Sequence, residues 1–261
     1  IVRPRLVTLP WPSRTWRVSE GYYGMVWHGF VGELIGTLIL ITIGCGVGAG
    51  LNLNRTFSSQ QKDWFYVAFA WGLAVTMGVY AAGSLGSLGH LNPAVTIAFA
   101  INHTFPWRQV VPYILGQFIG AFLGAVLVII QFWVHFQATP EKKQNTVGIF
   151  ATVPAIKSGW ANLLSEVIAT FMFMLVLINL GNFTLGLKPL IVGLSIFAIG
   201  AGLGTTTGFA LNPARDWGPR LAYTILPVPH KTSSQWWYAW VPMIGPLLGA
   251  IVATLVEEMV K

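Results

Sequence analysis

The sequence predicts an all-α membrane protein with six transmembrane helices and two half-helices, arranged as an inverted repeat around a central pore. Three observations lead to this prediction: long apolar segments, two halves that repeat the same motifs in order, and an Asn-Pro-Ala box in each half. Of the 261 residues, 54 % are hydrophobic and 9 % are charged, whereas a soluble domain carries about a quarter charged residues. We therefore expect the chain to lie in a lipid bilayer.

Six apolar segments are long enough to cross a hydrocarbon core of about 30 Å, which takes roughly 20 helical residues. Only two of them contain an acidic or basic residue, which is Glu33 in the first and Glu166 in the fourth. The six predicted spans are approximately 29–50, 64–83, 109–133, 160–181, 189–207 and 236–256.

Residues 1–28 form an N-terminal arm that lacks the apolar core of a signal peptide. Arg14 and Arg17 stand shortly before the first span, which favours a cytoplasmic arm. Because the number of spans is even, the C-terminus is expected on the same side. The net charge of +7 comes from basic residues scattered over loops and the arm, so no nucleic-acid partner is expected.

The two halves of the chain carry the same motifs in the same order, and each has an odd number of crossings. The second copy must therefore enter the membrane from the opposite face, as in inverted repeats whose functional site lies near the midplane. We expect one channel domain over 29–257, with repeats at about 29–135 and 160–257 and a connector at about 136–159. The paired motifs are GELIGTLILIT (32–42) with SEVIATFMFML (165–175), LNPAVT (91–96) with LNPARD (211–216), and QFIGAFLGA (117–125) with PMIGPLLGA (242–250).

Each Asn-Pro-Ala box predicts the start of a half-helix. Asn92 and Asn212 are favourable N-caps, and proline suits the first helical position because its missing N–H would be unsatisfied there anyway. Each apolar run after the box lasts about ten residues, which reaches only about 15–18 Å at the helical rise. Two such half-helices entering from opposite faces would meet at mid-depth, with each side-chain NH2 free to donate outward.

The segments before the two boxes, 84–90 and 203–210, are rich in Gly, Ser and Thr. Irregular backbone at membrane depth is tolerated only where it is buried or lines a wet cavity. We expect these segments to be extended and to present carbonyl acceptors to the pore, notably at Gly89, His90, Gly208 and Ala210. Acceptors along one wall and two amide donors at the centre suit small neutral hydroxylic solutes, and the half-helix fields oppose cations and protons.

These boxes, HLNPAVT and GFALNPARD, resemble those of the aquaporin and glycerol-facilitator family, in a repeat that covers about 29–257. The resemblance implies a homotetramer in which each subunit has its own pore. It also implies a constriction, or selectivity filter, formed by Trp71, Gly200, Phe209 and Arg215. Gly200 is expected to leave space empty where strict water channels carry a histidine. Trp71 and Phe209 form an aromatic corner for the CH face of a polyol, and Arg215 donates to its hydroxyls.

Further features resemble the glycerol branch of the family, namely Asp216 after the arginine, Arg220 four residues later, and Pro242 in the last span. Glu33 and Glu166 are costly in lipid, so they are expected to face inward and to accept N–H groups from the nonhelical segment of their own half. They are therefore assigned a structural role, as is Asp216.

The predicted function is a passive channel for glycerol, other small neutral polyols and water that excludes ions and protons. The predicted location is the plasma membrane. Two alternatives remain open: a water-selective channel in which Trp71 or Phe209 closes the gap at Gly200, and a proton-coupled transporter that uses Glu33 and Glu166. No nucleophile–base pair or phosphate loop indicates an enzyme, and no cysteine or histidine spacing predicts a metal site or a cofactor.

Overall fold

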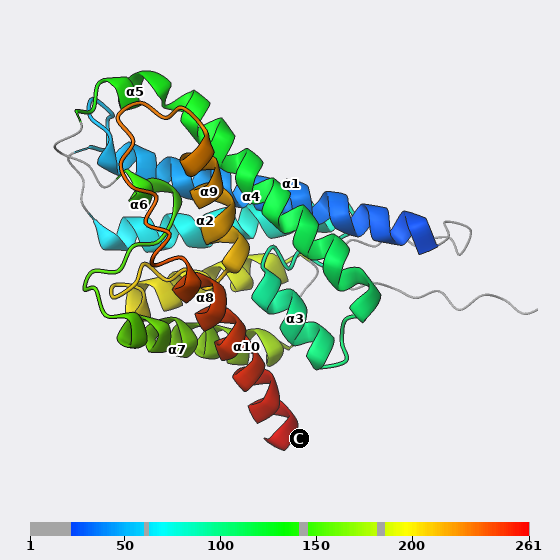
Figure 1. Ribbon diagram of the computed structural model, residues 1–261. Coiled ribbons are helices and arrows are strands. Elements are labelled where there is room, and N and C mark those ends of the chain that lie inside the picture. Colours follow the sequence, from blue (N-terminus) through cyan, green and yellow to red (C-terminus); the bar gives the residue numbers. More distant parts are fainter. Residues whose placement is uncertain (1–21, 60–62, 141–145, 182–185, 261) are drawn as a thin grey trace, which may run out of the picture.

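The computed structural model describes residues 22–59, 63–140, 146–181 and 186–260, and all regular structure within these ranges is helical. The all-α prediction is therefore confirmed. In Figure 1 the longer helices lie beside one another with shorter helices among them. The longer helices are α1 (Tyr22–Asn52), α2 (Trp64–Ser84), α4 (Val110–Gln131), α7 (Gly159–Ile178), α8 (Lys188–Leu203) and α10 (Trp240–Val260). Two of the shorter ones are the half-helices α3 (Pro93–Ile101) and α9 (Pro213–Ile225).

Among the described residues, five segments are long and apolar enough to cross a bilayer, namely Val26–Asn52, Trp64–Ser84, Trp107–Gln131, Gly159–Ile178 and Trp240–Val260. The fifth predicted span, 189–207, differs from the structure because α8 ends at Leu203. The helix stops there because Gly204 follows as its C-cap, and the chain then turns so that the Thr207 hydroxyl reaches Glu166. A run of apolar and small residues does not distinguish the end of a helix from the turn that follows it.

The last span begins four residues later than the predicted 236–256, at Trp240. The backbone before it accepts hydrogen bonds from other elements: Arg220 donates to the Ser234 carbonyl oxygen and Trp217 to that of Ala239. These long-range contacts hold residues 234–239 in turns, so the helix starts after them.

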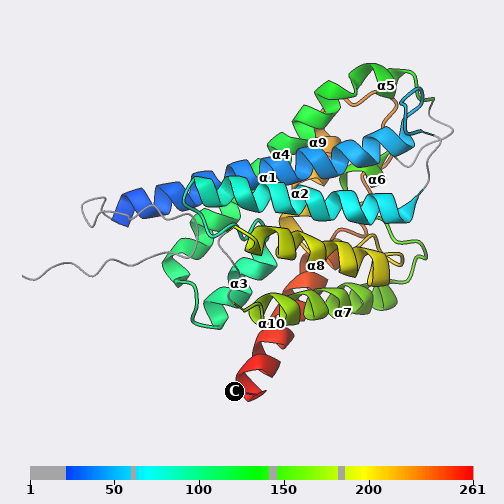
Figure 2. The ribbon, with the colours of Figure 1, turned by 180° about the vertical axis from the view of Figure 1, so that it is seen from behind.

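The two halves pack by the same plan. Helix α1 packs on α4 as α7 packs on α10, and α2 and α8 pack on each other at the centre. Each half-helix lies against the last long helix of the other half, α3 on α10 and α9 on α4. Figure 2 shows α1, α2, α8 and α7 as a row of neighbouring helices. This reciprocal packing fits the predicted inverted repeat.

Glycines allow the closest helix contacts within each half. A Cβ added to Gly120 of α4 would lie 2.2 Å from the Leu34 carbonyl oxygen of α1. In the other half, a Cβ at Gly249 of α10 would lie 2.4 Å from the Val167 carbonyl oxygen of α7. Small residues let helices approach closely in membranes, where packing rather than water exclusion drives association.

The connector and the arm contain helical structure that the sequence analysis did not predict. The short helix α5 (Trp133–Gln137) overlaps the start of the connector and α6 (Val147–Phe150) lies within it. A 3-10 turn at Trp107–Gln109 precedes α4. Residues 22–28 of the predicted arm belong to α1. The rest of the arm, residues 1–21, and residues 141–145 of the connector lie outside the described residues.

Candidate pore and constriction

The N-terminal ends of the two half-helices meet and are joined by their capping asparagines. The side-chain oxygen of Asn92 accepts from the Ala94 N–H at 2.9 Å, and that of Asn212 accepts from the Ala214 N–H at 3.0 Å. At a rise of 1.5 Å per residue, α3 and α9 are only about 14 Å and about 20 Å long, so neither crosses the hydrocarbon core alone.

The asparagine amides also bind across the interface between the two halves. Asn92 Nδ2 donates to the Leu211 carbonyl oxygen at 2.7 Å, and Asn212 Nδ2 donates to the Leu91 carbonyl oxygen at the same distance. The expectation that each NH2 group is free is therefore wrong for one of its two N–H donors, which is already bonded to the other half. Because a primary amide has two N–H donors, one per asparagine remains to face the cavity that both residues line.

Glu33 organises the nonhelical segment of the first half. Its carboxylate accepts the backbone N–H of His90 at 2.9 Å and of Leu91 at 2.6 Å, together with the Ser87 hydroxyl. Gln117 Nε2 adds a further bond at 2.7 Å. Four donors satisfy this fully buried carboxylate, which would otherwise be costly at membrane depth.

Glu166 has the equivalent arrangement in the second half. Its carboxylate accepts the backbone N–H groups of Ala210 and Leu211, both at 3.0 Å, and the Thr207 hydroxyl at 2.6 Å. Leu211 has a left-handed φ of 54°, as Leu91 has at 50°. Such backbone is unfavourable for branched residues, so the carboxylates hold both segments in a conformation that the chain alone would avoid.

The nonhelical segments are shorter than the predicted 84–90 and 203–210. Ser84 ends α2 and Leu203 ends α8, and turns occupy the next residues, so the irregular backbone that reaches the boxes begins at Ser87 and Gly208. A cavity of about 610 Å³ runs along these segments. It is lined by Gly89, His90 and Ala210 of the predicted backbone positions, and its described lining does not include Gly208.

Arg215 lines this cavity and contacts both the Trp71 ring and the Phe150 carbonyl oxygen. Its guanidinium carbon is 4.0 Å from the centre of the Trp71 ring, and Nη1 donates to the Phe150 carbonyl oxygen at 3.1 Å. Phe209 lines the same cavity. Three of the four predicted constriction residues, Trp71, Phe209 and Arg215, thus line the same cavity, and Arg215 contacts Trp71.

Gly200 lies behind the constriction rather than on the cavity wall. A Cβ added there would meet Phe209 ring carbons at 2.9 Å, and one at Gly204 would meet the same ring at 2.4 Å. The expectation that Gly200 leaves empty space is therefore wrong, because the Phe209 ring occupies that space. Trp71 is accommodated in the same way, since its ring lies 2.4 Å from a Cβ added at Gly44.

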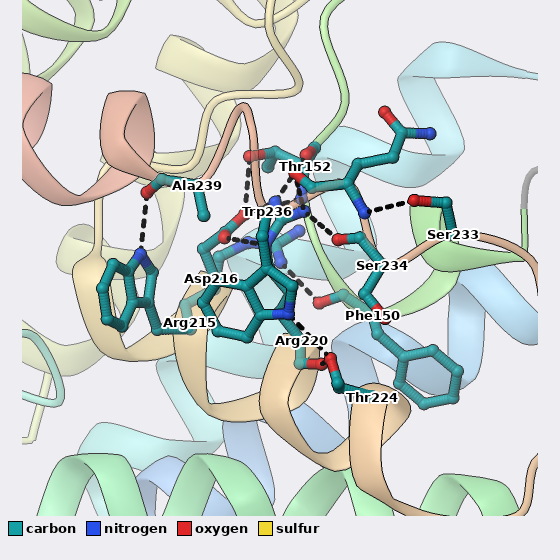
Figure 3. Close-up of polar contacts among 12 residues, drawn as sticks. Phe150, Thr152, Arg215, Asp216, Arg220, Thr224, Ser233, Ser234, Trp236 and Ala239 are labelled. Atoms are coloured by element: carbon teal, nitrogen blue, oxygen red, sulfur yellow. Dashed lines mark hydrogen bonds and ion pairs between the residues drawn. The ribbon is translucent and has the colours of Figure 1, made fainter.

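A buried ion pair fixes the connector behind Arg215. Arg220 Nε and Asp216 Oδ1 are 2.8 Å apart, and both side chains are fully buried. Asp216 accepts the Thr152 N–H and hydroxyl, each at 2.7 Å, and Arg220 donates to the Thr152 carbonyl oxygen at 2.9 Å. Figure 3 shows these contacts beside Phe150 and Arg215. The sequence analysis did not identify Phe150 or Thr152, because no local motif marks residues whose partners, Arg215 and Asp216, lie 65 and 64 positions away.

Within the described ranges, no group of three or more His, Cys, Asp or Glu residues is placed to hold a metal ion. The arrangement is instead a cavity with a guanidinium and an aromatic corner at one level and two amide donors at another.

Together, the fold and this cavity define an integral membrane protein with two inverted halves and two half-helices that meet inside the bundle. The family described as major intrinsic protein matches residues 23–257, and the chain belongs to this family.

The chain is 60 % identical over 235 residues to glycerol uptake facilitator protein 2 of Lactiplantibacillus plantarum, covering 90 % of this chain and 100 % of that relative. It is 50 % identical over 222 residues to the glycerol uptake facilitator protein of Bacillus subtilis, covering 84 % and 80 %. Among solved structures, the aquaglyceroporin from Plasmodium falciparum matches with a TM-score of 0.78 and 29 % identity, over 90 % of this chain and 96 % of that one.

Proposed function

We propose that the chain is a passive channel that conducts glycerol, other small neutral polyols and water across the plasma membrane. The observation that carries the proposal is that Arg215, Trp71 and Phe209 line one cavity, with Arg215 stacked on Trp71. A guanidinium is a fixed fork of donors that suits the hydroxyls of a polyol, and aromatic faces suit its CH groups. Relatives at 60 % and 50 % identity are named glycerol uptake facilitators, which agrees with this solute class.

Exclusion of cations and protons belongs to the same proposal. The N-terminal ends of α3 and α9 meet at Asn92 and Asn212, and each helix end carries roughly half a positive charge. Arg215 adds a full positive charge on the cavity wall. A cation in the cavity therefore meets positive potential at two levels, whereas a neutral solute replaces its water contacts with the amide and guanidinium donors. We further propose a homotetramer with cytoplasmic termini.

The alternative of a proton-coupled transporter receives little support from the two buried glutamates. Glu33 and Glu166 are fully buried, their carboxylates accept backbone N–H groups of their own halves, and the described lining of the cavity includes neither. The water-selective alternative rests on the Phe209 ring, which occupies the space beside Gly200.

Stopped-flow light scattering on proteoliposomes tests the proposal. The purified chain should raise glycerol permeability well above that of empty vesicles, and a protonophore should leave the flux unchanged. Fast water flux with glycerol permeability equal to that of empty vesicles would indicate the water-selective alternative. A glycerol flux that collapses with the proton gradient would indicate a coupled transporter.

A further inference from the structure

Trp64 does not line the cavity but contacts Phe209 and Gly200, two of the four residues predicted for the constriction. It is the first residue of α2, after the N-cap Asp63, and its side chain is not among the described residues that line the cavity. Its ring packs edge-to-face on Phe209, with ring centroids 5.6 Å apart and an interplanar angle of 81°. Its Nε1–H donates to the Gly200 carbonyl oxygen at 2.9 Å.

The Phe209 ring lies in a recess between α8 and the start of α2. Phe209 stands in the nonhelical segment with a left-handed φ of 38°, directly after Gly208 with a φ of 84°. The ring is enclosed by Gly200 and Gly204 of α8 and by Trp64 of α2. The two glycines supply a recess without side chains, so Trp64 is the large side chain among these three neighbours.

The indole N–H gives Trp64 a defined orientation relative to that recess. The Gly200 carbonyl oxygen accepts from the Gly204 N–H at 3.2 Å and from Trp64 Nε1 at 2.9 Å. One carbonyl therefore receives both the end of α8 and the aromatic ring from α2. Trp64 ties the start of α2 to the end of α8 at the level of the constriction.

We propose that Trp64 is a positioning residue that sets the size limit of the pore by holding the Phe209 ring against Gly200 and Gly204. This inference rests on the proposed polyol conduction. A smaller residue at position 64 would leave space behind Phe209, the ring would withdraw into it, and the aromatic corner would open. Solutes broader than glycerol would gain most from the opening.

The test compares the permeability to a four-carbon polyol, erythritol, with that to glycerol in proteoliposomes of matched protein content. For Trp64→Leu, the erythritol-to-glycerol ratio should rise at least about twofold, the lower end of what an edge-to-face aromatic contact contributes. Trp64→Phe keeps a ring and loses the N–H donor, so its ratio should lie between those of wild type and Trp64→Leu. If Trp64→Leu does not reconstitute, Trp64→Phe decides alone, and a wild-type ratio would then overturn the proposal.

Trp160→Leu is the matched control. Trp160 also lies in the first turn of a long helix, α7, and also packs edge-to-face on an aromatic ring, that of Trp240 at 6.3 Å, away from Phe209. Its ratio should equal that of wild type. An unchanged ratio in Trp64→Leu, or an equal rise in Trp160→Leu, would contradict the role of Trp64.

A second readout separates this inference from the proposed function. With 4-fluorophenylalanine at position 209, the ¹⁹F resonance should shift and change its linewidth in Trp64→Leu and should not in Trp160→Leu. This result does not depend on which solute passes. A wild type without glycerol flux would overturn the proposed function and the size-limit role together, whereas an unchanged resonance would overturn the positioning role alone.

Discussion

The guanidinium of Arg215 stacks on the ring of Trp71, with 4.0 Å between the guanidinium carbon and the ring centre. The contact joins the first turn of half-helix α9 to the middle of α2, and thus joins the two halves of the repeat. A buried cation stacked on a ring is held more strongly than an exposed one, and Arg215 is buried. The relationship fixes the direction of the guanidinium donors that face the cavity.

Arg215→Ala should increase the conductance of cations and protons. The substitution removes a positive charge from the cavity wall and widens the constriction, so the barrier to cations falls. Proton leak into proteoliposomes under a potassium diffusion potential, followed with a pH-sensitive dye, measures the change. A leak equal to that of wild type would mean that exclusion does not depend on Arg215.

Asp216→Asn should strongly destabilise the protein because it leaves Arg220 buried without its charged partner. Breaking a buried ion pair by removing one partner costs about 3–5 kcal/mol. Thr152→Val removes only one hydroxyl donor to Asp216, so its expected cost is about 1 kcal/mol. In detergent, the unfolding temperature should be highest for wild type, lower for Thr152→Val and lowest for Asp216→Asn.

Thr224→Val is the control for this series. Thr224 lies on α9, the helix that carries Asp216 and Arg220. Its hydroxyl also forms hydrogen bonds: it donates to the Arg220 carbonyl oxygen at 2.7 Å and accepts from Trp236 Nε1 at 3.0 Å. Neither of these two bonds of the Thr224 hydroxyl reaches the connector. It should therefore leave the erythritol-to-glycerol ratio unchanged, whereas Thr152→Val, which loosens the Phe150 carbonyl that holds Arg215, should alter it. Equal ratios in the two variants would show that the connector does not influence the constriction.

Asn92→Ala and Asn212→Ala should be energetically coupled. Each substitution removes an N-cap, which costs about 0.5–2 kcal/mol, and also one of the two reciprocal bonds between the halves. Because the second bond loses its geometry once the first is gone, the double variant should cost less than the sum of the single ones. A double-mutant cycle measured by denaturation checks this, and strict additivity would show that the two ends act independently.

Gly120→Ala should destabilise the protein and Gly46→Ala should not. A Cβ at Gly120 would collide with the backbone of α1, and forced helix separation of this kind costs about 1–3 kcal/mol. Gly46 is also helical, but nothing lies within 4 Å of a Cβ there, so alanine should be neutral or stabilising by up to about 1 kcal/mol. Similar unfolding temperatures for the two variants would contradict the close contact between α1 and α4.

The sequence could predict the helices and their repeat because these depend on local patterns. Asn followed by Pro states where a half-helix starts, and a glutamate in an apolar run must be satisfied by nearby donors, so Glu33 and Glu166 could be assigned to the nonhelical segments. The hydrogen bonds of both residues have this arrangement. The role of the constriction residues stays a prediction.

The sequence could not show which side chain occupies the space beside a glycine. Gly200 suggested an opening, but the Phe209 ring takes that space because the nonhelical segment turns the ring toward α8. Nor could it show that one N–H of each asparagine amide is already bonded, because Asn92 and Asn212 each donate to a carbonyl more than 100 positions away. The start of α10 was misplaced for the same reason, since Arg220 and Trp217 bind the backbone before it.

The most direct test of the account measures glycerol and water permeability in one proteoliposome preparation, for wild type and for Phe209→Ala. We expect high glycerol permeability in wild type, and in Phe209→Ala a rise in both glycerol and water permeability because the ring no longer narrows the constriction. Wild-type vesicles that pass water quickly and glycerol no faster than bare lipid would contradict the claim that Trp71, Phe209 and Arg215 form a path for polyols.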